Sequence, residues 1–178
     1  MNSIKQIEVL LADRLVGRLA LTKEGLCAFE YAPDWLGSGF SISPFELPLR
    51  SGVFIAKPRP FEGGFGVFDD CLPDGWGLLI VDRYLQQKGI NPRALTLLDR
   101  LALVGSSGRG ALEFRPDHSV VTRQDYADFE KLALEAERIL GSDEYRGKGI
   151  EEFQDRGGSP GGARPKIFAR YEGKEWLV

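Results

Sequence analysis

Three short apolar segments separated by two tight turns open this sequence and restrict the folds available to it. The segments are Ile7–Ala12, Leu15–Leu21 and Cys27–Tyr31, and the predicted turns are Asp13-Arg14 and Lys23–Gly25. Short segments rich in aliphatic and aromatic side chains and bounded by turn residues are typical of antiparallel strands. The first part of the chain is therefore predicted to form an antiparallel sheet.

Beyond residue 40 the pattern changes from strands to loops and helices. Prolines at positions 44, 48, 58 and 60 predict loops and short edge strands, because proline cannot donate to a sheet. Apolar spacing predicts a helix from Trp76 that ends at Gly89. Asn91 before Pro92 is typical of a helix start, and this second helix is predicted to end at Gly105. Further predictions are a strand at Ala111–Phe114, a helix at Asp125–Leu140 and a hairpin at Pro165–Val178.

Together these elements predict an α+β fold with a β-rich N-terminal subdomain and packed helices. The antiparallel sheet of residues 5–60 is expected to pack against helices near residues 76–88 and 92–104. Three regions are expected along the chain: the N-terminal subdomain at 1–116, a helix and polar linker at 117–156, and the start of another lobe at 157–178.

Charge and cysteine content narrow the classes of function. The 178 residues carry a net charge of −3 and have a pI near 5.3, which argues against a dedicated nucleic-acid binder with a basic face. Cys27 and Cys71 have apolar neighbours, so both are predicted to be free thiols of a cytoplasmic protein. Asp13 and Arg14 interrupt the first apolar stretch, so no signal peptide is expected. No segment approaches the roughly 20 apolar residues that cross a membrane.

Nucleophilic and metal chemistry find little support in the sequence. His118 is the single histidine and lies in a polar stretch, so it is expected to be a solvated loop residue rather than part of a catalytic triad. This histidine and the two cysteines lack the spacing of zinc ligands. The carboxylate pairs Asp69-Asp70 and Glu151-Glu152 are expected to be solvated or capping residues, and the first pair is expected to help start the segment leading to Trp76.

A glycine-rich segment near the end of the sequence gives the clearest chemical signal. Residues 157–162 contain four glycines, one serine and one proline, and Arg164 and Lys166 follow them. Glycines let backbone N–H groups approach an anion and nearby cations neutralise its charge, so the pattern fits a phosphate-binding loop. It is neither a GxGxxG fingerprint nor a Walker A loop, because Lys166 comes four residues after Gly162. Taken alone, the segment fits a flexible linker better than a phosphate-binding loop.

Three motifs occur in the order in which they occur in HipA-family serine/threonine protein kinases. Gly66–Gly77 resembles the family signature F-x-x-x-L-P-D-G, and Leu97–Phe114 resembles its LL-x-x-(I/V)-G motif followed by G-A-L. Ser159–Lys166 is similar to the family's serine-bearing phosphate loop, S-x-x-G-A-(Q/R)-x-K. The stretches that carry the resemblance are distributed between residues 66 and 166.

The resemblance implies a kinase that uses ATP and Mg²⁺ to phosphorylate protein serines, with aminoacyl-tRNA synthetases among the family's targets. It also implies a type II toxin–antitoxin system in which a HipB-like helix-turn-helix antitoxin holds the kinase. Contact with DNA would then be indirect, through the antitoxin. Residues 157–178 would begin the kinase N-lobe, with Ser159 as the autophosphorylation site whose modification expels the loop. The residues implied to line the ATP phosphates are Gly161, Gly162, Ala163, Arg164 and Lys166.

The sequence departs from the family pattern at two places. Residues 105–110 lack the Asp that frequently follows the glycine, which leaves the roles of Ser106 and Ser107 open. The family's nucleotide-binding lysine should follow a W-x-(V/L)-K strand, whereas this sequence ends at Trp176-Leu177-Val178. The chain is therefore expected to be the N-terminal part of a longer kinase and inactive by itself. A stand-alone module that inhibits a partner kinase in trans is the alternative.

Overall fold

The computed structural model describes the chain as two compact units. The described residues are 4–108, 110–119, 129–141, 162, 164, 166, 168–171 and 174–177. Unit 1 comprises Met1–Leu72 and Leu95–Ser119, and unit 2 comprises Pro73–Ala94 and Val120–Val178. Each unit thus draws on two separate stretches of sequence.

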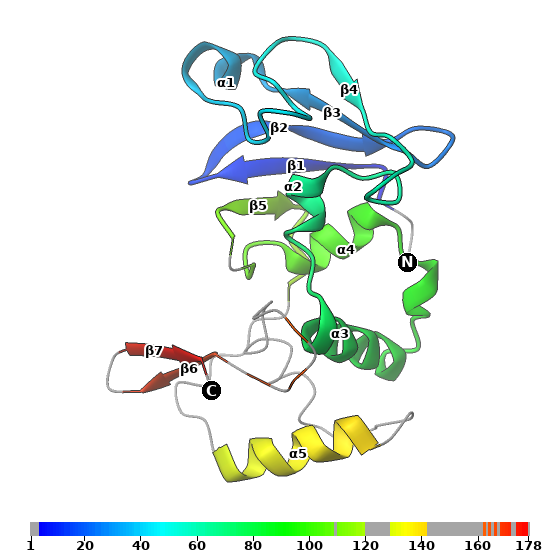
Figure 1. Ribbon diagram of the computed structural model, residues 1–178, viewed down its shortest axis with the longest axis vertical. Helices are drawn as coiled ribbons and strands as arrows, with labels where there is room; N and C mark the ends of the chain where they lie inside the picture. The colour runs from blue at the N-terminus through cyan, green and yellow to red at the C-terminus, as the bar shows by residue number, and fades with distance from the viewer. Residues whose placement is uncertain are drawn as a thin grey trace. The chain divides into compact units, whose positions relative to one another are not determined.

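Unit 1 is built on a five-stranded antiparallel sheet with the order β4-β3-β2-β1-β5 (Figure 1). The three strands predicted at the start of the chain are confirmed, and the strand predicted near residue 112 pairs with the first of them. The first turn lies one residue earlier than predicted, because Ala12 and Asp13 take the positive φ angles of a two-residue hairpin, 49° and 59°. The strands are β1 (Gln6–Leu11), β2 (Arg14–Leu21), β3 (Cys27–Tyr31), β4 (Val53–Ile55) and β5 (Leu112–Arg115).

Alternation along the strands, interrupted by a β-bulge between Val9 and Leu10, gives this sheet one buried face and one open face. On the buried face the register aligns one residue from each of four strands, Ile7, Leu19, Phe29 and Phe54. On the open face it aligns one residue from each of the five strands, Arg115, Glu8, Arg18, Glu30 and Val53. A slip of one residue would exchange these rows, so burial of the first row fixes the register.

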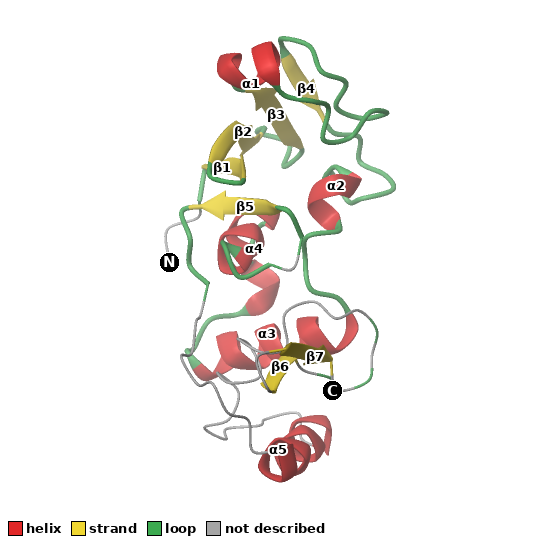
Figure 2. Ribbon diagram, turned by 90° about the vertical axis from the view of Figure 1, so that its left-hand side faces the viewer, coloured by secondary structure: helices red, strands yellow, loops and turns green. Residues whose placement is uncertain are grey.

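Helices α2 (Gly66–Asp69) and α4 (Leu97–Val104) complete the core of unit 1. Both lie beside β5 in two perpendicular views (Figures 1 and 2). The ring of Phe68 lies 5.5 Å from that of Phe29 and 6.4 Å from that of Phe114, so α2 joins two strands that are not neighbours. Leu98 and Leu101 bring α4 into the same buried cluster.

The second predicted helix begins later than the sequence suggested. Asn91 accepts a hydrogen bond from the N–H of Arg93 at 3.1 Å and opens only a 3₁₀ turn, η1 (Pro92–Ala94). Helix α4 instead starts at Thr96, whose hydroxyl accepts from the N–H of Asp99 at 3.2 Å, while the Asp99 carboxylate accepts from the N–H of Thr96 at 3.0 Å. This reciprocal capping box satisfies two donors at once, which the Asn-Pro pair does not.

The segment between β3 and the proline-rich stretch contains a helix that the sequence did not indicate. Helix α1 (Pro33–Ser38) begins with proline, which suits the first helical position. Its Trp35 is buried and donates its ring N–H to the carbonyl of Phe40 at 2.9 Å. The helix has only about one and a half turns. The buried Trp35 side chain holds it in place, and it has no periodic apolar pattern from which it could be predicted.

Unit 2 contains helices α3 (Gly75–Gln87) and α5 (Phe129–Gly141), the η1 turn and a hairpin of β6 (Phe168–Tyr171) and β7 (Lys174–Leu177). Its described core is formed by Trp76 and Ile80 of α3 with Ala136 and Ile139 of α5. The sequence predicted that the helix near 76–88 packs on the sheet, but these buried side chains belong to the second core because α5 offers them an apolar face. None of the described helices is long and apolar enough to cross a lipid bilayer.

Candidate functional site

The predicted phosphate loop lies partly within the described residues. Gly162, Arg164 and Lys166 are described, and they belong to unit 2. Ser159, Gly161 and Ala163 lie outside the described residues, so their assignment stays a prediction. The site can therefore be built from the three described loop residues and the helix that they contact.

Gly162 joins the loop to the first turn of α3. Its carbonyl oxygen accepts a hydrogen bond from the backbone N–H of Trp76 at 2.9 Å. Its φ of +82° lies in the left-handed region that favours glycine. A Cβ at this position would lie 3.1 Å from Nζ of Lys166, so the lysine ammonium sits directly against the loop backbone. The positive φ thus favours glycine here, whereas the flexible end of Lys166 could shift slightly to admit a Cβ.

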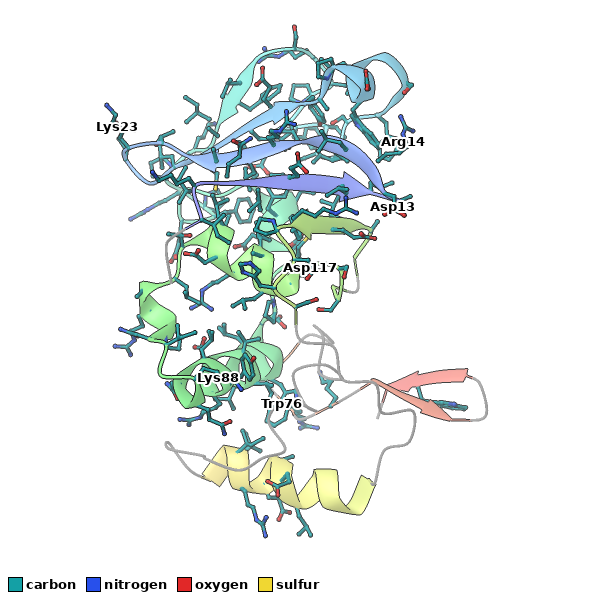
Figure 3. The ribbon with its side chains drawn as sticks, turned by 180° about the vertical axis from the view of Figure 1, so that it is seen from behind. Asp13, Arg14, Lys23, Trp76, Lys88 and Asp117 are labelled. Carbon is teal, nitrogen blue, oxygen red and sulfur yellow. The ribbon has the colours of Figure 1, made fainter. Side chains whose placement is uncertain are left out.

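The start of α3 carries the positive end of a helix dipole (Figure 3, at Trp76). The N-cap residue Asp74 makes no side-chain capping hydrogen bond, and the first turn of α3 contains no acidic residue. Lys166 is half-buried and its ammonium lies near Gly162, while Arg164 is exposed. A loop glycine, a helix N-terminus and two cations are the groups that recognise a phosphate.

The two cysteines and the histidine of the chain belong to unit 1 and not to the unit that contains this loop. Cys27 and Cys71 are free, and burial raises the pKa of both thiols to about 11, with the charge of Asp70 adding to the effect at Cys71. Both thiols are therefore protonated at neutral pH and are poor nucleophiles. His118 is exposed, as expected of a loop histidine. Among the described residues, no group of three or more His, Cys, Asp or Glu side chains could hold a metal ion.

The adjacent carboxylates Asp69 and Asp70 end a helix instead of starting one. Asp69 is the last residue of α2, and the N–H of its C-cap residue Asp70 donates to the carbonyl of Gly66 at 2.9 Å. Burial raises the pKa of Asp69, and the neighbouring charges of Asp70 and Glu62 raise it further. The expectation that this pair begins the segment leading to Trp76 is wrong, because α2 is a separate short helix. Glu151 and Glu152 lie outside the described residues.

Asp117 gives Ser106 a role that the sequence left open. The Asp117 carboxylate accepts hydrogen bonds from the N–H of Ser106 at 3.0 Å, from its hydroxyl at 2.5 Å, and from the N–H of Ser119 at 2.8 Å (Figure 3). Burial alone would raise the pKa of Asp117, but these hydrogen bonds outweigh it and lower the pKa. Gly105 has a φ of +50°, and a Cβ there would collide with the same carboxylate. Residues 105–106 thus form a turn closed by an acid from farther along the chain.

Ser107 has a more local role in the same turn. Its hydroxyl donates to the carbonyl of Val104 at 2.9 Å, and its N–H donates to the same oxygen at 2.9 Å. The two bonds satisfy a carbonyl at the end of α4, where the helix itself leaves carbonyls without partners. Both serines therefore terminate α4 and lead the chain into β5.

The described residues form a β-rich α+β domain and a second unit in which a glycine of the loop is bonded to the first turn of α3. A model of the HipA N-terminal domain matches residues 7–115, which is more than half of the chain. The chain belongs to the HipA N-terminal domain family. This match spans the five strands from Ile7 of β1 to the end of β5.

The chain is also similar in fold to a solved structure. That structure is described as the Shewanella oneidensis MR-1 toxin–antitoxin system HipA, HipB and operator DNA complex. The TM-score is 0.55 with 23% sequence identity, and the match covers 96% of this chain. The chain spans only 37% of the length of the protein that it matches.

Proposed function

We propose that this chain is the N-terminal regulatory and ATP-loop portion of a HipA-like serine/threonine protein kinase. The observation that supports this proposal is the hydrogen bond between Gly162 and Trp76, with Lys166 beside Gly162. Gly162 and Lys166 come after a domain of the HipA N-terminal family in the sequence. A loop glycine tied to a helix N-terminus and accompanied by a lysine can position the phosphates of a nucleotide. Phosphoryl transfer depends mainly on such positioning and on neutralisation of charge.

In this proposal each loop residue has a defined task. Backbone N–H groups of Gly161–Ala163 approach the ATP phosphates, and Arg164 and Lys166 neutralise their charge. Ser159 is the autophosphorylation site. A phosphate there adds a charge of about −2, which repels the nucleotide and favours expulsion of the loop. Mg²⁺ and the catalytic groups come from the part of the kinase beyond this chain, so the isolated chain is expected to bind ATP only weakly.

The partners follow from the family and from the similar structure. We propose a HipB-like helix-turn-helix antitoxin as the binding partner in a toxin–antitoxin system, with DNA reached only through that antitoxin. The substrate is a cytoplasmic protein phosphorylated on serine or threonine, with an aminoacyl-tRNA synthetase as the candidate from family resemblance.

A stand-alone binding module is the second candidate function. The observation that favours it is that the strands and helices of unit 1 share one buried cluster to which no described residue of unit 2 belongs. A domain with its own core can act without a kinase attached to it. In that case unit 1 would bind and inhibit a kinase encoded separately.

Phosphorylation of the full-length protein that carries this chain tests the main proposal. After incubation with Mg-ATP, mass spectrometry should locate phosphate on Ser159, and Ser159→Ala should abolish it. Lys166→Met should weaken ATP binding at least about tenfold, whereas Lys88→Met, which removes an exposed cation at the far end of α3, should leave it unchanged. Phosphate elsewhere, or equal effects of the two lysine variants, would reject the proposed loop.

A further inference from the structure

The sheet of unit 1 ends in an exposed apolar edge at β4. This strand is last in the order of the sheet, and its Val53 and Ile55 are 58% and 59% exposed (Figure 1). The other four strands carry charged residues in the aligned row of the open face, and that row changes to valine only at β4. Exposed aliphatic side chains on a free edge strand are typical of a strand that receives a further neighbour.

The backbone of β4 is oriented to accept such a neighbour. The N–H of Ala56 donates to the carbonyl of Cys27 at 2.8 Å, and Ile55 stands opposite Ala28 in the register. In an antiparallel ladder, hydrogen bonds to one neighbour alternate along the strand. The N–H and C=O groups of Val53 and Ile55 therefore point away from β3, toward the open edge. The same two residues thus offer both backbone groups and apolar side chains.

The stretch of sequence around β4 is basic in a chain of net negative charge, although Glu30 of β3 stands opposite Val53. Residues 47–60 contain Arg50, Lys57 and Arg59 and no carboxylate, although the whole chain has a net charge of −3. All three cations are exposed, and within the described part of the chain none of them forms an ion pair. The Arg50 guanidinium lies 4.6 Å from the centre of the Phe54 ring, which holds one charge beside the strand.

We propose that β4 is a docking edge for an acidic, extended peptide segment of a partner protein, which adds a strand to the sheet. Main-chain hydrogen bonds would supply affinity, and side chains at alternate positions would supply specificity. Gly52, with a φ of +108°, and Pro58 confine the pairing to the three residues of β4 and their immediate flanks. The fitting segment has two aliphatic residues at alternate positions, with carboxylates on either side of them.

The same charges argue against a second copy of this chain as the occupant. Antiparallel pairing of two β4 edges would bring the Arg50 side of one copy toward the Lys57 side of the other, so like charges would oppose each other. An acidic segment would instead gain from the same positions. The inference rests on unit 1 alone and does not depend on the phosphate loop of unit 2.

Peptide binding to the intact chain tests the proposal. The probe is a short fluorescent peptide with a Val-Thr-Val centre and two acidic residues at each end, measured by fluorescence anisotropy. Replacing its acidic ends by lysines should weaken binding at least about tenfold, as should N-methylation of the amides that face β4. Binding should also fall as the salt concentration rises.

Variants of the protein distinguish binding at the β4 edge from unspecific attraction of an acidic peptide to positive charges. The double variant Lys57→Glu/Arg59→Glu should lose the acidic peptide at least about tenfold, whereas Arg93→Glu, an equally exposed arginine of unit 2, should change binding less than about twofold. Circular dichroism of each variant checks that the fold is kept. Tolerance of N-methylation, no preference for acidic ends, or equal effects of these charge changes would overturn the proposal. A dimer of the chain that Val53→Lys dissociates would overturn it in favour of a second copy.

Discussion

Unit 1 and unit 2 are stabilised by cores of different kinds. In unit 1, aromatic rings from strands and helices contact one another in a continuous cluster that includes Phe29, Tyr31, Phe54, Phe68 and Phe114. The described core of unit 2 consists of four buried side chains contributed by two helices far apart in the sequence. Large aromatic surfaces dominate core energetics, so this cluster is expected to supply most of the stability of unit 1.

This difference has a consequence for function. Loops that bind ligands and change position belong to the less stable parts of a protein. Gly162 and Lys166 lie in the unit with the smaller described core, and the free strand edge β4 lies in the unit with the larger one. A sheet backed by a large aromatic core suits the docking proposed for β4.

The largest effect is expected from removing an aromatic ring in unit 1. Phe29 is fully buried, and its ring lies 4.9 Å from that of Tyr31 and 5.5 Å from that of Phe68. Phe29→Ala should lower the free energy of unfolding by about 3–5 kcal/mol, measured by urea denaturation. Phe45→Ala, at a fully exposed phenylalanine of the same unit, should change it by less than about 0.5 kcal/mol. Similar losses for both would mean that the aromatic cluster does not dominate unit 1.

Truncation in the core of unit 2 should have a smaller and more local effect. Ile139 is fully buried against α3, while its neighbour Leu140 is 53% exposed. Ile139→Ala should cost about 2–3 kcal/mol, and hydrogen exchange should quicken in α3 and α5 but not in β1–β3. Leu140→Ala should leave both patterns unchanged. Equal loss of protection in the two units would contradict the comparison, because it would show that they unfold as one body.

Two glycines with positive φ, one from each unit, sharpen the comparison further. Gly105 has a φ of +50° and Asp117 occupies the place of a Cβ, whereas Gly89 has a φ of +74° with nothing within 4 Å. Gly89→Ala should cost about 1 kcal/mol, from backbone strain alone. Gly105→Ala should cost about 2 kcal/mol, because the Asp117 carboxylate must also leave Ser106. Thermal denaturation of the two variants measures the gap, and equal losses would show that the Asp117 contact contributes nothing.

Local signals explain which parts of the fold were predictable. The first three strands were placed because alternation and turn residues lie within a few positions of one another. The start of α4 was misplaced because Asn91-Pro92 is a strong local signal, although Thr96 followed three residues later by Asp99 is a capping box that the sequence also contained. Helix α1 could not be predicted from the sequence because it is short and is held by one buried tryptophan.

The candidate site was predictable only in part, because sequence signals extend over only a few neighbouring positions. The preference for glycine at position 162 and the presence of Lys166 follow from a local motif. The bond from Trp76 to Gly162 and the closure of the 105–106 turn by Asp117 join residues that only the fold brings together. No periodicity or spacing encodes such pairs, so tertiary structure was needed to find them.

A further effect of modest size is expected at Asp99, the buried carboxylate that ties α4 to the start of the sheet. Asp99 is only 3% exposed, and it accepts hydrogen bonds from the N–H of Ile4 at 3.0 Å and from the Thr96 hydroxyl at 2.7 Å. Asp99→Asn places an amide donor against one of these donors, so it should cost about 1–2 kcal/mol at neutral pH. Urea denaturation of the two proteins at several pH values measures this difference.

The pH dependence of that difference tests whether the charge of Asp99 is responsible. Burial raises the pKa of Asp99, but hydrogen bonds from Ile4 and Thr96, with a smaller contribution from His118, lower it below its ordinary value of 3.8. A carboxyl group whose pKa is lower in the folded state stabilises the fold above its unfolded pKa, and this stabilisation is lost as pH falls through the folded pKa. The advantage of the natural protein over Asp99→Asn should therefore be constant above about pH 5 and shrink below pH 3.8. The pKa of Asp117 is also lowered, by its hydrogen bonds to Ser106 and Ser119, but Asp117 is present in both proteins, so its contribution cancels in the difference. An advantage that stays constant down to about pH 2 would show that the anchor acts through shape and not through the ionised carboxylate.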